Sequence, residues 1–255
     1  LEVRVPHVPC REGRIVYGRH ARDVRLERPV DVVRRREFDA DLVAQARARG
    51  VRIVEGEGLA SFAVDEAARI VRVETTAGRT LTSRVLVGAD GAASKVRRAL
   101  ARDGHAPLRL FQAEVPAPQG AAPLGERMIY DFSPMDEGLR GYVWLFPVAG
   151  GSVNVGAMHF PSRTLSGAGI EALLGRTLRR YGVELPDGAR GWPAWRYRRG
   201  ARVSAPHLLC VGDAAGIDAL TGEGIAVGLE EGPIAARAVA GALGSGDYAF
   251  ARYAR

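Results

Sequence analysis

The stretch VGDAAGIDALTGEGIAVGL, residues 211–229, decides the fold prediction. The apolar run HLLCVGD leads into it and predicts a buried strand, and a helix rich in small residues follows. Glycine costs about 1 kcal/mol relative to alanine in a helix interior, so Gly-Glu-Gly at a helix start is a poor choice for stability alone. Free N–H groups and a positive dipole end make a helix start an anion site. We therefore expect an anionic ligand against this backbone, with Thr221 as the helix cap.

Asp213 stands at the carboxyl end of the predicted strand. Ligands of α/β proteins bind outside the carboxyl ends of the strands, and a short carboxylate there accepts hydrogen bonds from sugar hydroxyls. Ala214, Ala215 and Gly216 leave room for a ligand to press on the main chain. The alternative interpretation is a tight strand-loop-helix turn that uses small residues for packing alone.

A second strand end with an acid occurs in VLVGADGAASKVRR, residues 85–98. Asp90 and Gly91 follow the buried run, and a short helix begins near Ser94. Asp-Gly by itself is a common turn signal. Because this segment repeats the strand-to-acid transition at Asp213, we expect the two acids and the later helix start to face one ligand.

Three arginines open the stretch RRREFDADL, residues 34–42, at the start of a predicted helix. Arg35 could clamp a pyrophosphate, because a guanidinium offers two parallel N–H groups to paired anionic oxygens. The alternative interpretation of such a charge run is a solvated basic surface.

The kind of secondary structure that the sequence predicts changes along the chain. The first part is rich in helix and buried strand: a helix at 37–50, a strand at 51–56, a three-strand meander at 58–83, a strand at 84–89 and a helix at 94–100. A block of antiparallel strands with one amphipathic helix follows, and then the buried strand and the long helix described above. This order predicts an α/β protein whose first domain is interrupted by a second. The predicted domains comprise residues 32–104 with 200–243, and residues 1–31 with 105–199.

Composition narrows the classes of function. The 255 residues are 47% hydrophobic and carry a net charge of +7, almost wholly from arginine, since Lys95 is the only lysine. The basic residues alternate with acids and lack interleaved aromatics, which disfavours nucleic-acid binding, while a basic surface suits phosphorylated ligands or anionic membrane surfaces. Cys10 and Cys210 do not form a disulfide framework, and the cysteines and histidines lack metal-ligand spacing. No apolar run approaches 18 residues, so we expect no membrane span. The absence of a disulfide framework fits a reducing cytoplasm, and the basic surface fits a peripheral membrane contact.

In their order along the chain, these segments resemble the flavoprotein oxidoreductases of the glutathione-reductase-type FAD fold, which include geranylgeranyl reductases, aromatic hydroxylases and flavin halogenases. The residues that carry the resemblance are Arg35-x-x-Phe38-Asp39, Gly88-Ala89-Asp90-Gly91-x-x-Ser94-x-x-Arg97, Gly212-Asp213-Ala214-Ala215-Gly216 and Gly222-Glu223-Gly224-Ile225. Within the group, LTGEGI and the strand GYVWLFP resemble the geranylgeranyl reductase family. The resemblance implies a Rossmann-like, three-layer FAD-binding domain interrupted by an antiparallel sheet domain that binds substrate.

FAD would be the cofactor, with NADH or NADPH as its reductant. The implied cofactor-binding positions are Arg35, Leu59, Asp90, Gly91, Arg97, Gly212, Asp213, Ala214, Gly222, Gly224 and Ile225. Asp213 would bind the ribityl or pyrophosphate region, and the amides at the helix start would face flavin N1 and O2, where charge builds on reduction. Tyr142 and Trp144 would contact substrate; alternating aromatics that only pack a sheet are the alternative.

The resemblance implies reduction of a small apolar organic substrate, isoprenoid in the reductase version, by reduced flavin. A flavin-dependent aromatic monooxygenase uses the same cofactor residues, so the sequence leaves that alternative open. The histidines are isolated and no acid stands out as a proton donor, so no catalytic residue is predicted. Neither the substrate nor the oligomeric state follows from the sequence.

One feature of the family is missing, because the sequence contains no strand, Gly-x-Gly-x-x-Gly and helix for the dinucleotide. Residue 1 is leucine, and we expect a partial sequence whose first βαβ unit lies upstream. The alternative is a non-catalytic fragment that binds FAD weakly or not at all. The second departure concerns two positions where the reductases usually carry proline: Leu139, at the start of the aromatic strand motif, and Ala219, after the acid.

Overall fold

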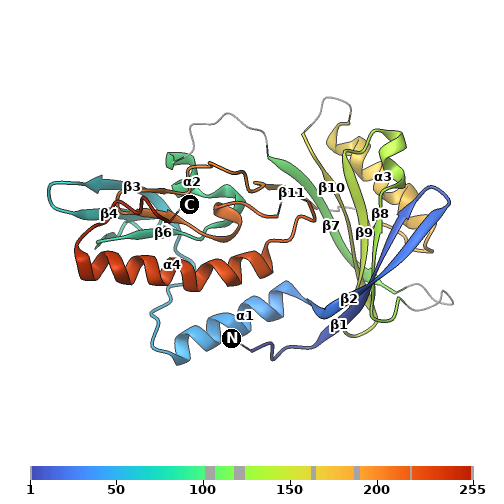
Figure 1. The fold of residues 1–255 in the computed structure, drawn as a ribbon, viewed down its shortest axis with the longest axis horizontal. Helices are drawn as coiled ribbons and strands as arrows, with labels where there is room; N and C mark the ends of the chain where they lie inside the picture. Colours follow the sequence, from blue (N-terminus) through green and yellow to red (C-terminus); the bar gives the residue numbers. More distant parts are fainter. Residues whose placement is uncertain are drawn as a thin grey trace. The chain divides into compact units, whose positions relative to one another are not determined.

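The computed structural model describes residues 2–100, 107–117, 124–161, 165–186, 190–218 and 220–253. The chain divides into two compact units, drawn in Figure 1. The large-sheet unit comprises residues 1–53 and 108–192, and the small-sheet unit comprises residues 54–107 and 193–255. The mixed α/β class predicted from the sequence is confirmed. Residues 32–53 group with the large-sheet unit, although the sequence assigned them to the FAD-binding part; the roles assigned to the two domains stay predictions.

The large-sheet unit is built on a seven-stranded sheet with the order β11-β7-β10-β9-β8-β1-β2. Its strands are β1 (His7–Tyr17), β2 (His20–Val33), β7 (Leu108–Pro116), β8 (Arg127–Asp131), β9 (Gly141–Val148), β10 (Ser152–His159) and β11 (Arg190–Ala194). The pairs β1–β2, β8–β9, β9–β10 and β10–β7 are antiparallel, whereas β1 runs parallel to β8. The predicted antiparallel block is therefore present, and the hairpin β1–β2 extends it.

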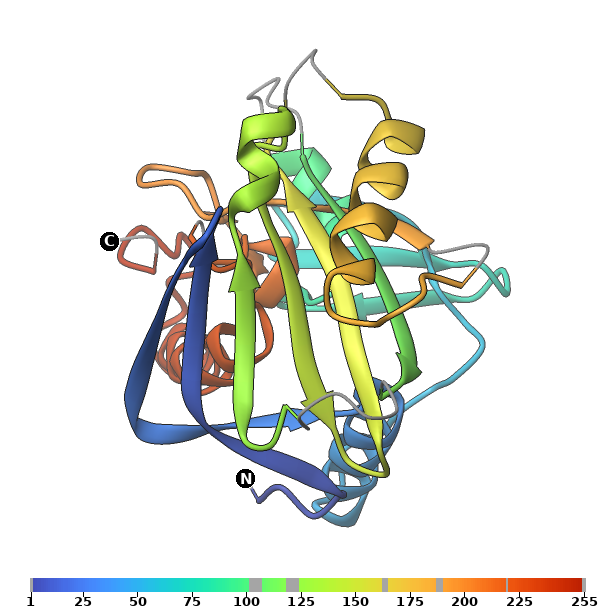
Figure 2. The ribbon, with the colours of Figure 1, turned by 90° about the vertical axis from the view of Figure 1, so that its right-hand side faces the viewer.

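Helix α3 (Gly167–Arg179) lies against one face of this sheet (Figure 2). The side chain of Ser166 accepts a hydrogen bond from the amide of Gly169 and caps the helix. Four buried apolar side chains at helical spacing form the contact face: Ile170, Leu173, Leu174 and Leu178. They meet Val143 and Leu145 of β9 and Val153 and Val155 of β10. Burying each leucine-sized side chain contributes roughly 1.5–3 kcal/mol, so this contact anchors the unit.

The opposite side-chain direction of β9 carries aromatic rings. Side chains alternate along a strand. The face opposite Val143 and Leu145 therefore carries Tyr142, Trp144 and Phe146. The ring centroids of Tyr142 and Trp144 lie 6.1 Å apart, and those of Trp144 and Phe146 lie 6.3 Å apart. Strand β9 thus packs aliphatic side chains on one face and aromatic side chains on the other.

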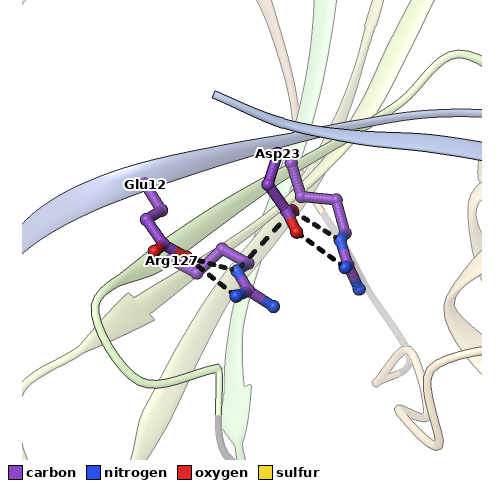
Figure 3. Close-up of polar contacts among 4 residues, drawn as sticks. Glu12, Asp23 and Arg127 are labelled. Atoms are coloured by element: carbon purple, nitrogen blue, oxygen red, sulfur yellow. Dashed lines mark hydrogen bonds and ion pairs between the residues drawn. The ribbon is translucent and has the colours of Figure 1, made fainter. Parts of the chain in front are cut away.

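Ion pairs join β1, β2 and β8 at one edge of the sheet (Figure 3). Arg127 donates to Glu12 at 2.7 Å and 3.0 Å, and it lies 3.8 Å from Asp23. Arg14 donates to both oxygens of Asp23 at 2.8 Å and 2.9 Å. The four side chains are between 35% and 44% exposed, so each pair is worth at most about 1 kcal/mol.

Helix α1 (Arg35–Ala48) agrees with the predicted helix and buries Phe38. The strand predicted at 51–56 was wrong, because those residues form no strand. Val51 and Val54 are 54% and 46% exposed, so the run VRIV lacks the partner strand that would bury it. An apolar run this short has no periodicity that could identify its structure.

The small-sheet unit contains two three-stranded sheets, ordered β12-β13-β6 and β3-β4-β5. Their strands are β3 (Leu59–Asp65), β4 (Ile70–Thr75), β5 (Thr80–Ser83), β6 (Leu86–Gly88), β12 (Ser204–Ala205) and β13 (Leu208–Cys210). The predicted meander is confirmed as β3-β4-β5, which is antiparallel throughout. Helices α2 (Lys95–Leu100) and α4 (Ile225–Ser245) follow β6 and β13.

Alternation along β13 explains the layers of this unit. Leu208 and Cys210 pack with α2 and the meander, whereas Leu209 faces α4 and packs with Ala235 and Ala242. The strands therefore lie between the meander on one side and α4 on the other, which can be followed in Figure 1. This arrangement confirms the predicted three-layer domain. Of the described helices, none is long and apolar enough to cross a membrane.

Candidate functional site

The candidate site lies where two parallel strands of the small-sheet unit end. Strand β6 pairs in parallel with β13, with Cys210 opposite Gly88. The amide of Val211 donates to the carbonyl of Gly88 at 3.0 Å and extends the pairing by one residue. The carboxyl ends of neighbouring parallel strands meet at one sheet edge, so Asp90 and Asp213 leave the sheet side by side.

Close packing of the first helix fixes the Asp90 end. A Cβ on Gly88 would lie 2.6 Å from the Cβ of Val96, so only glycine lets α2 approach β6 this closely. The carboxylate of Asp90 accepts the amide of Lys95 at 2.9 Å and orients the start of α2. Nζ of Lys95 donates to the carbonyls of Leu59 and Ala60 at 2.7 Å and 2.9 Å. Lys95 therefore connects two predicted cofactor positions, Leu59 and Asp90.

Arg97, on the helix after the first strand-end loop, binds the backbone of the second loop. Its side chain is buried, and Nη1 donates to the carbonyls of Ala214 and Ala215 at 2.9 Å and 2.8 Å. The guanidinium lies 4.9 Å from the ring centre of Trp195, whose indole donates to the carbonyl of Ala92 at 2.6 Å. A cation over an indole face with two carbonyl acceptors is a well-held geometry. Arg97 thus reaches the site through the backbone of residues 214–215.

The loop that carries Asp213 lies against the start of α4. Gly212 has φ +57°, a left-handed conformation that glycine adopts without steric cost. A Cβ on Gly224 would lie 2.5 Å from Oδ1 of Asp213 and 2.8 Å from Cγ2 of Ile217. The carboxylate of Asp213 therefore rests against the backbone just before the first turn of α4, which brings the predicted acid and helix start together.

The cap of α4 differs from the predicted one. Oε1 of Glu223 accepts the amides of Ile225 and Ala226 at 2.6 Å and 2.8 Å, so Glu223 caps the helix. The prediction that Thr221 is the cap was wrong, because its hydroxyl donates to Asp218 at 2.6 Å and accepts from the amide of Glu223. A glutamate two residues before the helix reaches its free amides, whereas Thr221 is held in a turn by Asp218. A carboxylate therefore occupies the anion site that the sequence predicted at this helix start.

The other predicted site residues fall into two groups. Gly91, Ala214 and Gly222 lie in the same loops as the acids, with Gly91 and Gly222 at φ +71° and +73°. Arg35 lies on α1 in the large-sheet unit and makes two hydrogen bonds of 3.1 Å with Asp39. Its guanidinium is thus neutralised by an acid one turn along the helix, and its role as a pyrophosphate clamp stays a prediction.

Tyr142 and Trp144 also lie in the large-sheet unit and are buried. The indole of Trp144 donates to Oδ1 of Asn154 at 2.7 Å, and a Cβ on Gly156 would lie 2.2 Å from its ring. Gly156 on β10 is therefore the residue that admits the indole. The ring centroids of Tyr130 and Tyr142 lie 5.5 Å apart and extend the aromatic cluster to β8.

Three buried titratable groups have shifted pKa values. Burial raises the pKa of both thiols, Cys10 and Cys210, to about 12, so each stays protonated. His159 is buried, accepts the amide of Arg140 at 3.0 Å, and has its pKa lowered by burial and by two arginines. Within the described part of the chain, no group of three His, Cys, Asp or Glu residues could hold a metal ion.

The FAD binding domain family matches residues 12–139, half of the sequence. This chain belongs to that FAD binding domain family. The menaquinone reductase of Mycolicibacterium smegmatis is 30% identical over 215 residues, which is 80% of this chain and 52% of the relative. The menaquinone reductase of Mycobacterium tuberculosis H37Rv is 29% identical over the same shares. The chain of this FAD-family member thus spans about half the length of the curated relatives it matches.

Solved structures support the fold. A geranylgeranyl bacteriochlorophyll reductase-like protein from Thermoplasma acidophilum gives a TM-score of 0.78 at 19% identity, over 95% of this chain and 65% of that one. The flavin-dependent halogenase CmlS gives 0.72 at 19% identity, over 92% and 46%. At these identities the likeness shows the fold alone, which is that of flavin-dependent oxidoreductases.

The residues at the strand ends fit FAD in their chemistry. Two carboxylates, Asp90 and Asp213, suit hydroxyl groups, and left-handed glycines keep the intervening backbone free of side chains. The start of α4 already holds the carboxylate of Glu223 on two amides, which shows that it accepts a delocalised negative charge. No role was assigned to Lys95 and Trp195 from the sequence, because their partners lie far along the chain. Glu223 was missed although its contacts are local, because Thr221 was the predicted cap.

Proposed function

We propose that this chain forms part of an FAD-dependent oxidoreductase that reduces an apolar, isoprenoid-bearing substrate, of the polyprenyl quinone or prenyl lipid class. The proposal depends on one observation above all: Asp90 and Asp213 follow adjacent parallel strands beside the start of α4 in a chain of an FAD-binding family. The similarity to proteins named menaquinone reductase supports the substrate class.

Each part of the strand-end site has a separate task. Asp213 and Asp90 accept hydrogen bonds from hydroxyl groups of the cofactor, and the glycines of the two loops let the cofactor approach the main chain. The amides of Ile225 and Ala226 hold negative charge, for which Glu223 must give way. FAD, when bound, supplies hydride transfer between a nicotinamide and the substrate.

The aromatic cluster of the large-sheet unit supports an apolar substrate. Tyr130, Tyr142, Trp144 and Phe146 offer ring faces and edges on one sheet face, with centroid separations of 5.1–6.3 Å along the cluster. Such rings stack on flat conjugated groups and pack against prenyl chains, and they exclude water. We propose that this cluster forms part of the substrate site and sets its preference for apolar molecules.

The test uses purified protein mixed with FAD. We expect a flavin absorbance spectrum that survives gel filtration, and bleaching of that spectrum by NADPH or NADH in the absence of oxygen. Reoxidation by a short-chain menaquinone analogue under nitrogen would support the reductase. Hydroxylation of the substrate that requires air would favour the monooxygenase instead. A protein that retains no flavin would contradict both functions.

We also propose that the protein meets its lipid substrate by peripheral contact with a membrane surface. The net charge of +7 and the apolar substrate class support this contact. Sedimentation with vesicles that contain anionic phospholipid, compared with vesicles of neutral phospholipid alone, tests it. Equal recovery in the supernatant with both would contradict the proposal.

A further inference from the structure

Glu231 on α4 reaches under the loop that carries Asp213. Its Oε2 accepts the amide of Gly212 at 2.5 Å, although the two residues stand 19 positions apart. One turn earlier on the helix, a Cβ on Gly228 would lie 3.4 Å from the Cα of Gly212. Glycine at both positions lets α4 lie directly against the loop, and Glu231 fills the space beyond that contact.

The loop is held at both ends by side chains of opposite charge. Glu231 holds the amide of Gly212 at its start, and Arg97 holds the carbonyls of Ala214 and Ala215 at its end. Inside the loop, the carbonyl of Gly212 accepts the amides of Ala215 and Gly216 at 2.8 Å and 2.9 Å. Gly212, the residue before Asp213, is thus fixed on both sides, because Glu231 holds its amide and the turn holds its carbonyl.

We infer that Glu231 is a positioning residue for cofactor binding, which directs the carboxylate of Asp213 by fixing the left-handed Gly212. This inference rests on the proposed function, because it gives the loop a ligand to meet. Glu231 itself lies beneath the loop and acts through the Gly212 amide. A rotation about the backbone bonds of Gly212 would turn Asp213 away from the start of α4.

The surroundings of Glu231 disfavour the charged form of its side chain, so packing alone does not explain a glutamate at this position. Burial raises the pKa of Glu231, and the negative charge of Asp213 raises it further, against the lowering effect of the Gly212 amide. From β13, the thiol of Cys210 faces the same charge, and from the C-terminal turn the phenol of Tyr253 does so. Because the folded protein disfavours this charge, the acceptor that Glu231 offers to Gly212 explains its presence better than stability does.

Substitutions of Glu231 by glutamine and by aspartate separate the effect of side-chain length from the effect of the negative charge. E231Q keeps the length and an amide oxygen as acceptor but removes the charge, whereas E231D keeps the charge on a side chain one methylene shorter. E231A removes both, and E230Q is the matched control, because Glu230 is the exposed neighbour on the same helix. Hydrogen–deuterium exchange of the free protein reports on residues 208–216, and quenching of FAD fluorescence reports on the affinity for the cofactor.

We expect faster amide exchange at residues 208–216 in E231A and E231D, together with about tenfold weaker FAD binding, as for the loss of one hydrogen bond to a charged group. E231Q should restore both to within about threefold of the unchanged protein, and E230Q should alter neither. Rescue by glutamine would not occur if only the charge mattered.

The outcomes distinguish the inference from the proposed function. If the unchanged protein fails to quench FAD fluorescence, the proposed function fails first. If it binds FAD and E231A binds equally well, Glu231 does not position the site, whatever the exchange data show. If E231D binds normally while E231Q does not, the charge is what matters and the inference is overturned.

Discussion

The two units use their residues in opposite ways. The large-sheet unit devotes alternating strands and α3 to an aliphatic core, in which Ile170, Leu173, Leu174 and Leu178 are fully buried. The small-sheet unit places left-handed glycines, a buried Arg97 and a partly buried Glu231 around two short strand ends. The difference teaches that the first unit is built for stability, while the second accepts backbone and charge costs that suit a ligand site.

The largest effect should come from breaking the core of the large-sheet unit. L174A removes most of a fully buried side chain, so it should lower the free energy of unfolding by about 2–5 kcal/mol. Denaturant titration followed by circular dichroism measures the loss. R179Q, on the exposed side of the same helix, should stay within about 0.5 kcal/mol. Equal losses for both variants would contradict the assignment of α3 to the core.

A smaller effect on stability, but a direct effect on the cofactor, should follow from G224A. The new methyl group must displace Asp213 and Ile217, at a cost of about 1–3 kcal/mol. Because Asp213 moves, we expect FAD affinity to fall at least about tenfold, measured by fluorescence quenching. As the control, G232A within α4 introduces a methyl group that meets no atom within 4 Å, and it should leave the affinity unchanged. Equal FAD affinities of G224A and G232A would contradict the placement of the cofactor beside Asp213 and Gly224.

The pH dependence of stability should distinguish the charged loop from the rest of the molecule. The pKa of Glu231 is raised in the folded protein, so its contribution is complete below the unfolded value and is lost as pH rises through the folded value. E231Q has no such titration. The unchanged protein should therefore lose stability relative to E231Q as the pH rises above the ordinary glutamate pKa of about 4.3, in parallel denaturant titrations. A stability difference that does not change with pH would show that the pKa of Glu231 is not raised.

The smallest effect should come from the exposed ion pairs of the large-sheet unit. R127Q removes the contacts with Glu12 and Asp23 and should cost at most about 1 kcal/mol. High salt should reduce that cost further, because exposed charges are screened. Thermal unfolding at low and high ionic strength measures it. A loss as large as that of L174A would overturn the division between a packed core and a weakly contributing edge.

The sequence predicted the parts of the fold that depend on local pattern. Alternation predicted the meander, helical spacing predicted α1 and α3, and the strand-acid-glycine segments predicted the sheet edge at Asp90 and Asp213. The run at 51–56 failed because an apolar tetrapeptide carries no period, and the predicted cap at Thr221 failed because Glu223 competes for the same amides. Strand β7 was not predicted either, since LRLFQAEVP pairs with β10 through contacts between residues 36 to 50 positions apart.

The roles of Lys95, Trp195 and Glu231 had no signal in the sequence, because each depends on a partner far along the chain. Lys95 meets Leu59, Trp195 meets Ala92 and Glu231 meets Gly212. Single residues of this kind are recognised only once the strands and helices are placed. The carboxylates and glycines of the site were predictable because turn chemistry and strand ends are local.

The only lysine of the chain stands beside the first strand-end acid, with its amine on the carbonyls of Leu59 and Ala60. Chemical labels that react with lysine side chains can therefore attach at a single side chain, next to Asp90. A fluorophore or cross-linker introduced in this way would report on the strand-end loops, with the amino terminus as the competing target.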